Sequence, residues 1–91
     1  MYSIQSGIIC VVDKKLKIKI FRLQFGKTVR RRRLRLGLSQ EDFAEKAEIH
    51  RTYVSSIELA KIEVGIGVAY KLAKALKTSL SKLIRNAENA L

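Results

Sequence analysis

The feature that most constrains the fold is a series of short amphipathic segments that begins at Phe25. From there on, apolar residues recur every three or four positions, and only a few residues separate one segment from the next. We expect helices at residues 27–36, 40–47, 51–59 and 66–76, and a last helix from residue 80 onward. Because helices this short are marginal alone and their connections are tight, neighbours must pack against each other directly. The pattern predicts an all-α fold, a five-helix orthogonal bundle.

Residues at the expected helix ends agree with these boundaries. Gly37 follows the first helix at the position where a left-handed residue is wanted. Ser39 offers an N-cap oxygen to the second helix, whose first turn carries Glu41 and Asp42 where the helix dipole favours negative charge. Glu48 occupies a turn position that prefers a left-handed backbone.

The first 24 residues have a different pattern. Leu16, Ile18 and Ile20 alternate with lysines at the period of a strand, and residues 13–15 offer a turn. Residues 1–24 therefore fit a β-hairpin or, equally, a flexible basic arm, and the pattern leaves both open. The folded domain is expected to cover residues 25–91.

The net charge of +11 is concentrated at one end of the chain. Residues 1–38 contain eleven basic residues against Asp13 alone, a net charge of +10, whereas residues 39–91 carry only +1. So uneven a distribution predicts a polyanionic partner, either nucleic acid or an anionic membrane surface.

Several classes of protein are disfavoured by the sequence. Cys10 and His50 are the only residues of their kinds, so we expect no internal disulfide and no metal site. No glycine-rich phosphate loop or nucleophile arrangement is present, so we expect no enzyme and no cofactor. The longest apolar run, residues 8–12, is too short to span a membrane, and the start lacks a signal-peptide pattern, which favours the cytoplasm.

Residues 40–58 have the length and spacing of a helix-turn-helix, in which the second helix is presented to the major groove of DNA. In the stretch "EIHRTYVSSIE", four polar residues stand where alanine, leucine or glutamate would build a better helix. Arginine can bond guanine bidentately, threonine offers a hydroxyl and a methyl to thymine, and small serines let a helix approach base edges. The expected base contacts are Arg51, Thr52, Ser55 and Ser56. The competing interpretation is a polar surface helix with no partner.

The segment "RLRLGLSQEDFAEKAEIHRTYVSSIE", residues 33–58, resembles the core motif of the phage repressor and Cro-like family, known as XRE-type regulators. Within it, "HRTYVSSIE" is especially similar to the controller proteins of restriction-modification systems. The resemblance covers about residues 25–85. It implies a buried ion pair between Arg33 and Glu58 that ties the first helix to the third, and it implies that Gln40 contacts the DNA backbone.

Phosphate contacts are expected from residues at helix starts and on the basic face of the first helix. Gln40 has a free side-chain amide beside exposed backbone N–H groups, and the hydroxyl of Tyr53 could reach a phosphate. The four consecutive arginines at residues 30–33 are by themselves weak evidence for phosphate binding, but they lie next to the helix-turn-helix motif, which strengthens that interpretation. The expected phosphate contacts are Ser39, Gln40, Tyr53, Lys27, Arg30, Arg31, Arg35 and Lys61.

The chain departs from the family after the third helix. Relatives usually have a basic residue and a glycine where this chain has Leu59 and Ala60, and Val64 stands where basic residues or proline are common. Only Lys61 remains there to grip the DNA backbone. These changes predict altered docking or reduced specificity.

The last helix has more apolar residues than the preceding helix can cover, which predicts a homodimer interface at Leu80, Leu83, Ile84 and Leu91. Alternatively, these side chains complete the core of the monomer. The sequence as a whole predicts a sequence-specific regulator of transcription that binds double-stranded DNA as a homodimer, with no membrane and no small-molecule ligand. The alternative is a protein-interaction adaptor that keeps the helix-turn-helix fold.

Overall fold

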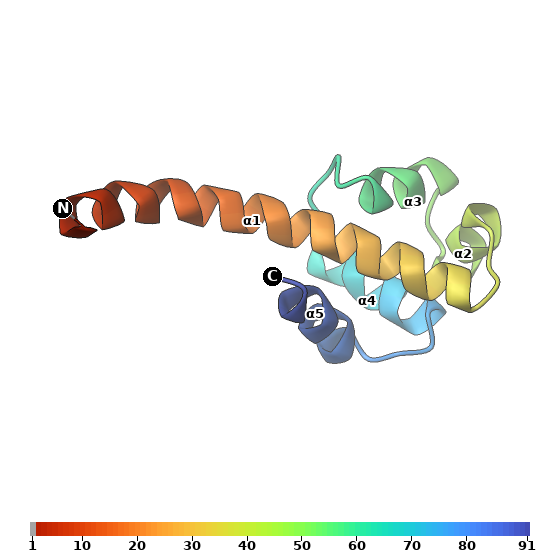
Figure 1. The fold of residues 1–91 in the computed structure, drawn as a ribbon. Coiled ribbons are helices and arrows are strands. Elements are labelled where there is room, and N and C mark those ends of the chain that lie inside the picture. The colour runs from red at the N-terminus through yellow and green to blue at the C-terminus, as the bar shows by residue number, and fades with distance from the viewer. Residues whose placement is uncertain (1) are drawn as a thin grey trace.

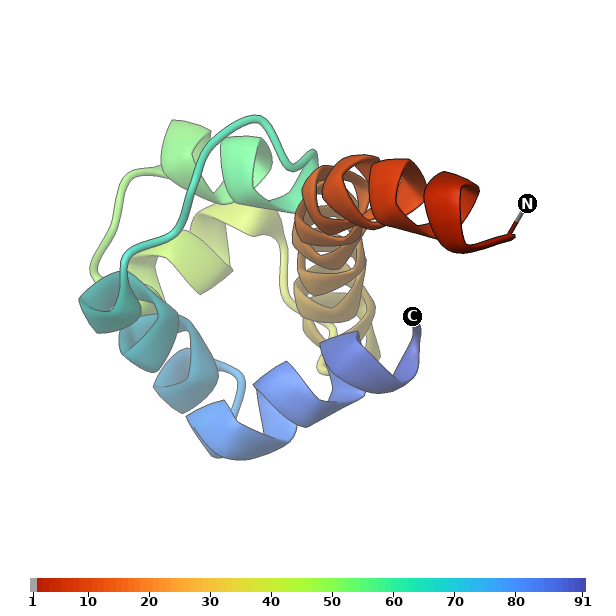
Figure 2. The ribbon, with the colours of Figure 1, turned by 90° about the vertical axis from the view of Figure 1, so that its left-hand side faces the viewer.

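The computed structural model describes the backbone of residues 2–91 and the side chains of residues 14–91. Over this range the chain forms five α-helices and no strand (Figure 1). They are α1 (Tyr2–Arg35), α2 (Gln40–Ala47), α3 (Arg51–Glu58), α4 (Ile66–Ala75) and α5 (Leu80–Asn89). The predicted all-α, five-helix fold is confirmed, and the predicted starts of α2 to α5 match. Viewed along α1, the other four helices surround the core and α1 closes one side (Figure 2).

The β-hairpin considered for residues 1–24 was wrong, because residues 2–24 continue α1, which the sequence analysis expected to begin only at residue 27. The alternation of apolar residues with lysine is real, but residues 13–15 contain no glycine or asparagine to reverse the chain. Leucine and lysine are good helix formers, so the helix passes through this stretch. The N-terminal half of α1 projects from the bundle (Figure 1), and residues 14–20 are exposed.

The hydrophobic core draws on all five helices. Its largest fully buried side chains are Phe43, Ile57, Leu72, Leu76, Leu83, Val29 and Val54. On α2 the apolar residues Phe43, Ala44 and Ala47 are all buried. Full burial of side chains of this size contributes roughly 1.5–3 kcal/mol each to folding.

Gly26 allows α1 and α3 to approach closely. A Cβ built on Gly26 would lie 2.6 Å from the carbonyl oxygen of Ile57 and 2.8 Å from that of Glu58. Only a residue without a side chain fits at this crossing. The sequence pattern did not reveal this constraint, because the partner carbonyls are more than thirty positions away in the chain.

The predicted helix ends are present. Gly37 has a φ of 72°, and the amide of Leu38 donates to the carbonyl of Arg33 over 3.1 Å, which closes α1 as a left-handed cap does. Ser39 caps α2 by accepting from the amide of Asp42 at 3.0 Å. Glu48 has a φ of 58°, as expected for this turn. Ala60 has the same value and therefore carries a side chain where glycine is favoured.

Candidate nucleic-acid interface

The helices α2 and α3 pack against each other across a short turn. The amide of Ile49 donates to the carbonyl of Ala44 over 3.0 Å, and the left-handed Glu48 turns the chain between the two helices. α3 then begins at Arg51, with His50 as its N-cap residue. Val54 and Ile57 anchor α3 in the core. The arrangement is a helix-turn-helix in which one side of α3 faces outward.

The exposed side of α3 carries two of the predicted base-contacting residues. Arg51 and Thr52 are exposed in the first turn, whereas Ser55 and Ser56 are half-buried. Tyr53 is half-buried and packs against the core. The two serines therefore lie at the margins of the buried face of α3 and not on its outermost side.

A buried network ties α3 to α1 and α2. The guanidinium of Arg33 donates to both carboxylate oxygens of Glu58, from Nε over 2.6 Å and from Nη2 over 3.1 Å. Both side chains are nearly inaccessible, at 8% and 2% exposed. Nη1 of Arg33 also donates to the carbonyl of Leu38 over 2.8 Å. The ion pair that the resemblance implied between these two residues is therefore present, and it fixes the orientation of α3.

Gln40 belongs to the same network. Its side-chain nitrogen donates to Oε1 of Glu58 over 3.2 Å, so its amide is not free, contrary to the sequence analysis. A glutamine side chain has two N–H donors and an acceptor oxygen, and this bond uses one donor. Gln40 thus retains polar groups for a partner and holds them in a fixed position.

Arg32 has a structural role that the sequence analysis missed. Its Nε donates to the carbonyl of Leu76 over 2.9 Å, and its Nη2 donates to the carbonyl of Lys77 over 3.1 Å. These carbonyls lie at the C-terminal end of α4, where helix carbonyls lack partners within the helix. Helical spacing does place Arg32 on the same side of α1 as the buried Phe25 and Val29, but it does not reveal which carbonyls the guanidinium meets.

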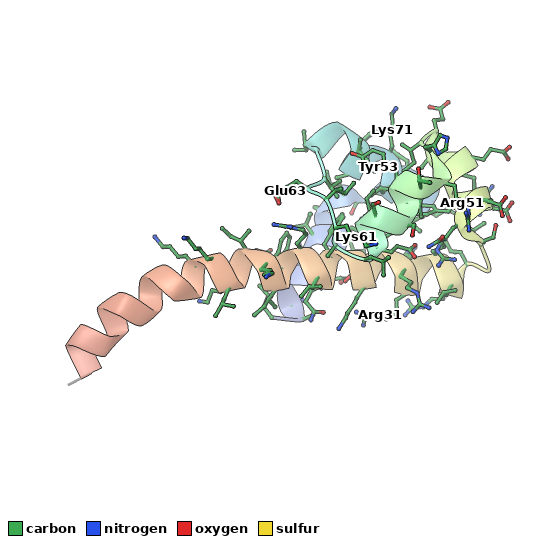
Figure 3. All side chains as sticks on the ribbon, turned by 90° about the horizontal axis from the view of Figure 1, so that it is seen from above. Arg31, Arg51, Tyr53, Lys61, Glu63 and Lys71 are labelled. Atoms are coloured by element: carbon green, nitrogen blue, oxygen red, sulfur yellow. The ribbon has the colours of Figure 1, made fainter. Side chains whose placement is uncertain are left out.

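The structure does not bring all predicted phosphate contacts together. Lys27, Arg30 and Arg31 line one shallow hollow on α1. Figure 3 shows that Arg31 projects from the side of α1 that faces away from α3, whereas Arg51 and Tyr53 extend from α3 itself. These three basic residues therefore form a group apart from the exposed surface of α3. Ser39 and Arg35 are exposed at the α1–α2 connection.

The loop after α3 carries mixed charge. Lys61 lies between α3 and α1 in Figure 3, and its side chain is exposed. Glu63, in the same loop, forms an ion pair of 3.2 Å with Arg22 of α1. Val64 is partly buried against the core, and Leu59 is 58% exposed. The departures from the family thus leave one cation and one uncovered leucine beside the end of α3.

The residues predicted for a dimer interface differ in exposure. Leu83 is 1% exposed and belongs to the monomer core, which corrects its assignment as an interface residue. Leu80 and Ile84 are half-buried at the edge of that core, and Leu91 is 60% exposed. Leu83 points inward because it shares with Ala87, one turn further on, the face of α5 that meets the other helices.

A family model described as helix-turn-helix matches residues 29–83. The chain therefore belongs to the XRE-type helix-turn-helix family of regulators, which are not enzymes. More particularly, it is homologous to restriction-modification control proteins. It is a DNA-binding regulator of transcription.

Control proteins of two bacteria and one solved structure are similar to this chain. The control protein C.SmaI of Serratia marcescens is 46% identical over 48 residues, which are 53% of this chain and 57% of C.SmaI. The control protein C.MunI of a Mycoplasma species is 35% identical over 68 residues, 74% of this chain and 92% of C.MunI. The crystal structure of the restriction-modification controller protein C.AhdI from Aeromonas hydrophila superposes with a TM-score of 0.66 at 34% identity. That superposition covers 67% of this chain and 92% of C.AhdI.

Within the described part of the chain, no helix is both long enough and apolar enough to cross a membrane.

Proposed function

We propose that this regulator recognises specific sequences in double-stranded DNA as a homodimer, with α3 of each subunit in the major groove. The observation that carries the proposal is the two-sided character of α3. Val54, Ile57 and Glu58 are buried, while Arg51 and Thr52 are exposed in the first turn of the helix. A rigidly held helix with hydrogen-bonding side chains at its exposed N-terminal turn is suited to reading base edges.

Arg51 is the strongest candidate for a base contact. Its guanidinium is exposed, and no side-chain bond within the described part of the chain engages it. Thr52 lies beside it, and Ser55 and Ser56 follow on the next turn with small side chains. Such residues permit close approach to a groove and specify bases by hydrogen bonds.

Phosphate contacts are proposed on both sides of α3. Gln40 and Ser39 lie at the start of α2, Lys61 follows α3, and Arg35 is exposed at the end of α1. Tyr53 adds a hydroxyl from α3. Lys27, Arg30 and Arg31 face away from α3, so their proposed contacts require DNA outside the segment that α3 would read.

The dimer is proposed to form around the apolar edge of α5. Leu80 and Ile84 are four positions apart and lie on one side of that helix, and Leu91, which follows its C-cap residue, is 60% exposed. Two recognition helices about one turn of DNA apart would supply the specificity that one helix lacks.

Selection of bound sites from random duplexes tests the proposed specificity. Once a preferred site is known, Arg51→Ala should cost about 1–3 kcal/mol at that site and relax discrimination at one base pair of each half-site. Gln40→Ala should weaken binding to all duplexes about equally. Lys82→Ala, which removes a charge on α5 away from α3, is the control. An equal loss by Arg51→Ala on specific and random duplexes would show that Arg51 does not read a base.

Sedimentation tests the proposed dimer. Ile84→Glu should give a folded monomer that binds a single half-site and no longer binds a two-half-site operator tightly. Because Ile84 also touches the core, Leu91→Glu at an exposed position serves as a second variant that cannot disturb folding. A wild-type chain that remains monomeric at micromolar concentration, both free and on DNA, would refute the dimer.

The alternative, an adaptor that keeps the helix-turn-helix fold, is favoured only by exposed apolar side chains such as Leu59 and Ile66. Such an adaptor would show no preference among duplexes in the selection experiment.

A further inference from the structure

The N-cap residue of α3 is unusual. Serine, threonine, aspartate and asparagine are preferred at this position because their short side chains accept a hydrogen bond from an amide of the first turn. In α3 the N-cap residue is His50, whose side chain makes no such bond. Instead, Nδ1 of His50 lies 3.1 Å from the hydroxyl oxygen of Thr52, within hydrogen-bond distance. The imidazole is thus directed at a side chain of the exposed surface.

This hydrogen bond constrains what Thr52 can present to a partner. A threonine hydroxyl has one hydrogen and two lone pairs, and it normally rotates to suit its surroundings. If the lone pair of Nδ1 accepts, the hydroxyl hydrogen is committed to His50 and only oxygen lone pairs remain for a base. If Nδ1 carries the hydrogen, the hydroxyl hydrogen remains available to a base. In either tautomer His50 fixes the hydroxyl and, through the branched Cβ, also the direction of the methyl group.

We propose that His50 is a positioning residue for base selection, acting through the hydroxyl of Thr52. The inference rests on the proposed function, in which Thr52 contacts a base. It extends that function by assigning specificity to a residue outside the α3 helix that need not touch DNA itself. It also accounts for a histidine at a position where a conventional capping residue would stabilise α3 better.

The first measurement identifies the base pair that Thr52 reads. Thr52→Val keeps the branched shape and a methyl group but removes the hydroxyl. Competition binding against operators substituted at each position should show discrimination falling at one base pair per half-site. The expected fall is about threefold to tenfold, the range that one net hydrogen bond supplies.

The second measurement tests whether His50 acts through that hydroxyl. His50→Ala should reduce discrimination at the same base pair by a similar factor, while preferences at the other base pairs stay unchanged. In the Thr52→Val background, His50→Ala should have no further effect on discrimination, because the group it positions is absent. His50→Asn places an amide where Nδ1 lies and should restore most of the discrimination. Circular dichroism confirms that each variant is folded.

Three outcomes would overturn the proposal. A uniform loss of affinity by His50→Ala on all duplexes would make His50 a phosphate contact. An equal effect of His50→Ala with and without the Thr52 hydroxyl would show that it acts on α3 as a whole. A failure of His50→Asn to restore discrimination would exclude the bond from Nδ1. If the proposed function itself fails, the wild-type chain shows no preference among duplexes, a result visible before any variant is made.

Discussion

Replacing Gly26 by alanine is expected to destabilise the fold, although the same change in an exposed helix stabilises it. In a helix interior, glycine is less favourable than alanine by roughly 0.5–1 kcal/mol. At Gly26 the added Cβ would meet two backbone carbonyl oxygens of α3, at 2.6 Å and 2.8 Å. Backbone atoms cannot rotate away, so α1 must retreat from α3 by several tenths of an ångström.

This movement of α1 would separate the apolar side chains of α1 and α3 that pack against each other. Phe25 and Val29 of α1 are buried in the core that also holds Val54 and Ile57 of α3. Overpacking of this kind typically costs about 1–3 kcal/mol. Since it exceeds the gain in helix propensity, we expect a net loss of about 1–2 kcal/mol in the free energy of unfolding. For a domain of this size, each kcal/mol lowers the melting temperature by roughly 4–8 °C.

Urea denaturation followed by circular dichroism measures this difference. Gly67→Ala is the matched control, because Gly67 lies in α4 and an added Cβ meets nothing within 4 Å. The two substitutions should therefore change the free energy of unfolding in opposite directions, with Gly67→Ala raising it by up to about 1 kcal/mol. If Gly26→Ala were as stable as Gly67→Ala, the close approach of α1 and α3 would not be a constraint on the fold.

Three further substitutions test other contacts. Ala60→Gly should raise the free energy of unfolding by about 0.5–1 kcal/mol, measured by thermal unfolding, because glycine adopts the left-handed backbone of this position without strain. No gain would mean that Ala60 is not strained there. Glu58→Ala should cost about 3–5 kcal/mol in urea denaturation, since it leaves the buried Arg33 without its partner; a cost below about 1 kcal/mol would contradict that burial. Arg32→Ala should lower the free energy of unfolding by about 1–2 kcal/mol in the same assay, because it removes the two bonds that cap α4. The control Arg30→Ala, at an exposed position, should change it by less than about 0.5 kcal/mol. Equal effects would refute the capping role.

The fold of residues 25–91 was accessible from the sequence because its signals are local. Helical spacing, Gly37 and Ser39 each report on their own neighbourhood, and the four later helices begin where those signals predicted. The N-terminal region was mispredicted because a period of two over residues 16–20 is compatible with a strand or with the exposed side of a helix. This stretch is helical because it extends the part of α1 that is packed against the bundle.

The candidate site was predictable in its residue types but not in its connections. Exposure of Arg51 and Thr52 follows from the positions of Val54 and Ile57 on the same short helix. The capping role of Arg32 and the bond from Gln40 to Glu58 depend on contacts between residues that are distant in sequence. The burial of Leu83 likewise depends on how α5 docks, which a helical pattern alone does not decide.

Two close contacts between α1 and α3 involve the C-terminal end of α3. Gly26 lies against the carbonyls of Ile57 and Glu58. Arg33 lies two turns further along the same face of α1 and donates to the carboxylate of Glu58. Both contacts fall on the last turn of α3, so that turn is fixed from the inside. The first turn presents Arg51 and Thr52 to solvent and is held to the core by the fully buried Val54. A shift of α1 at Gly26 would therefore move the last turn of α3, and because a helix this short moves as a unit, it would also change where Arg51 and Thr52 are held.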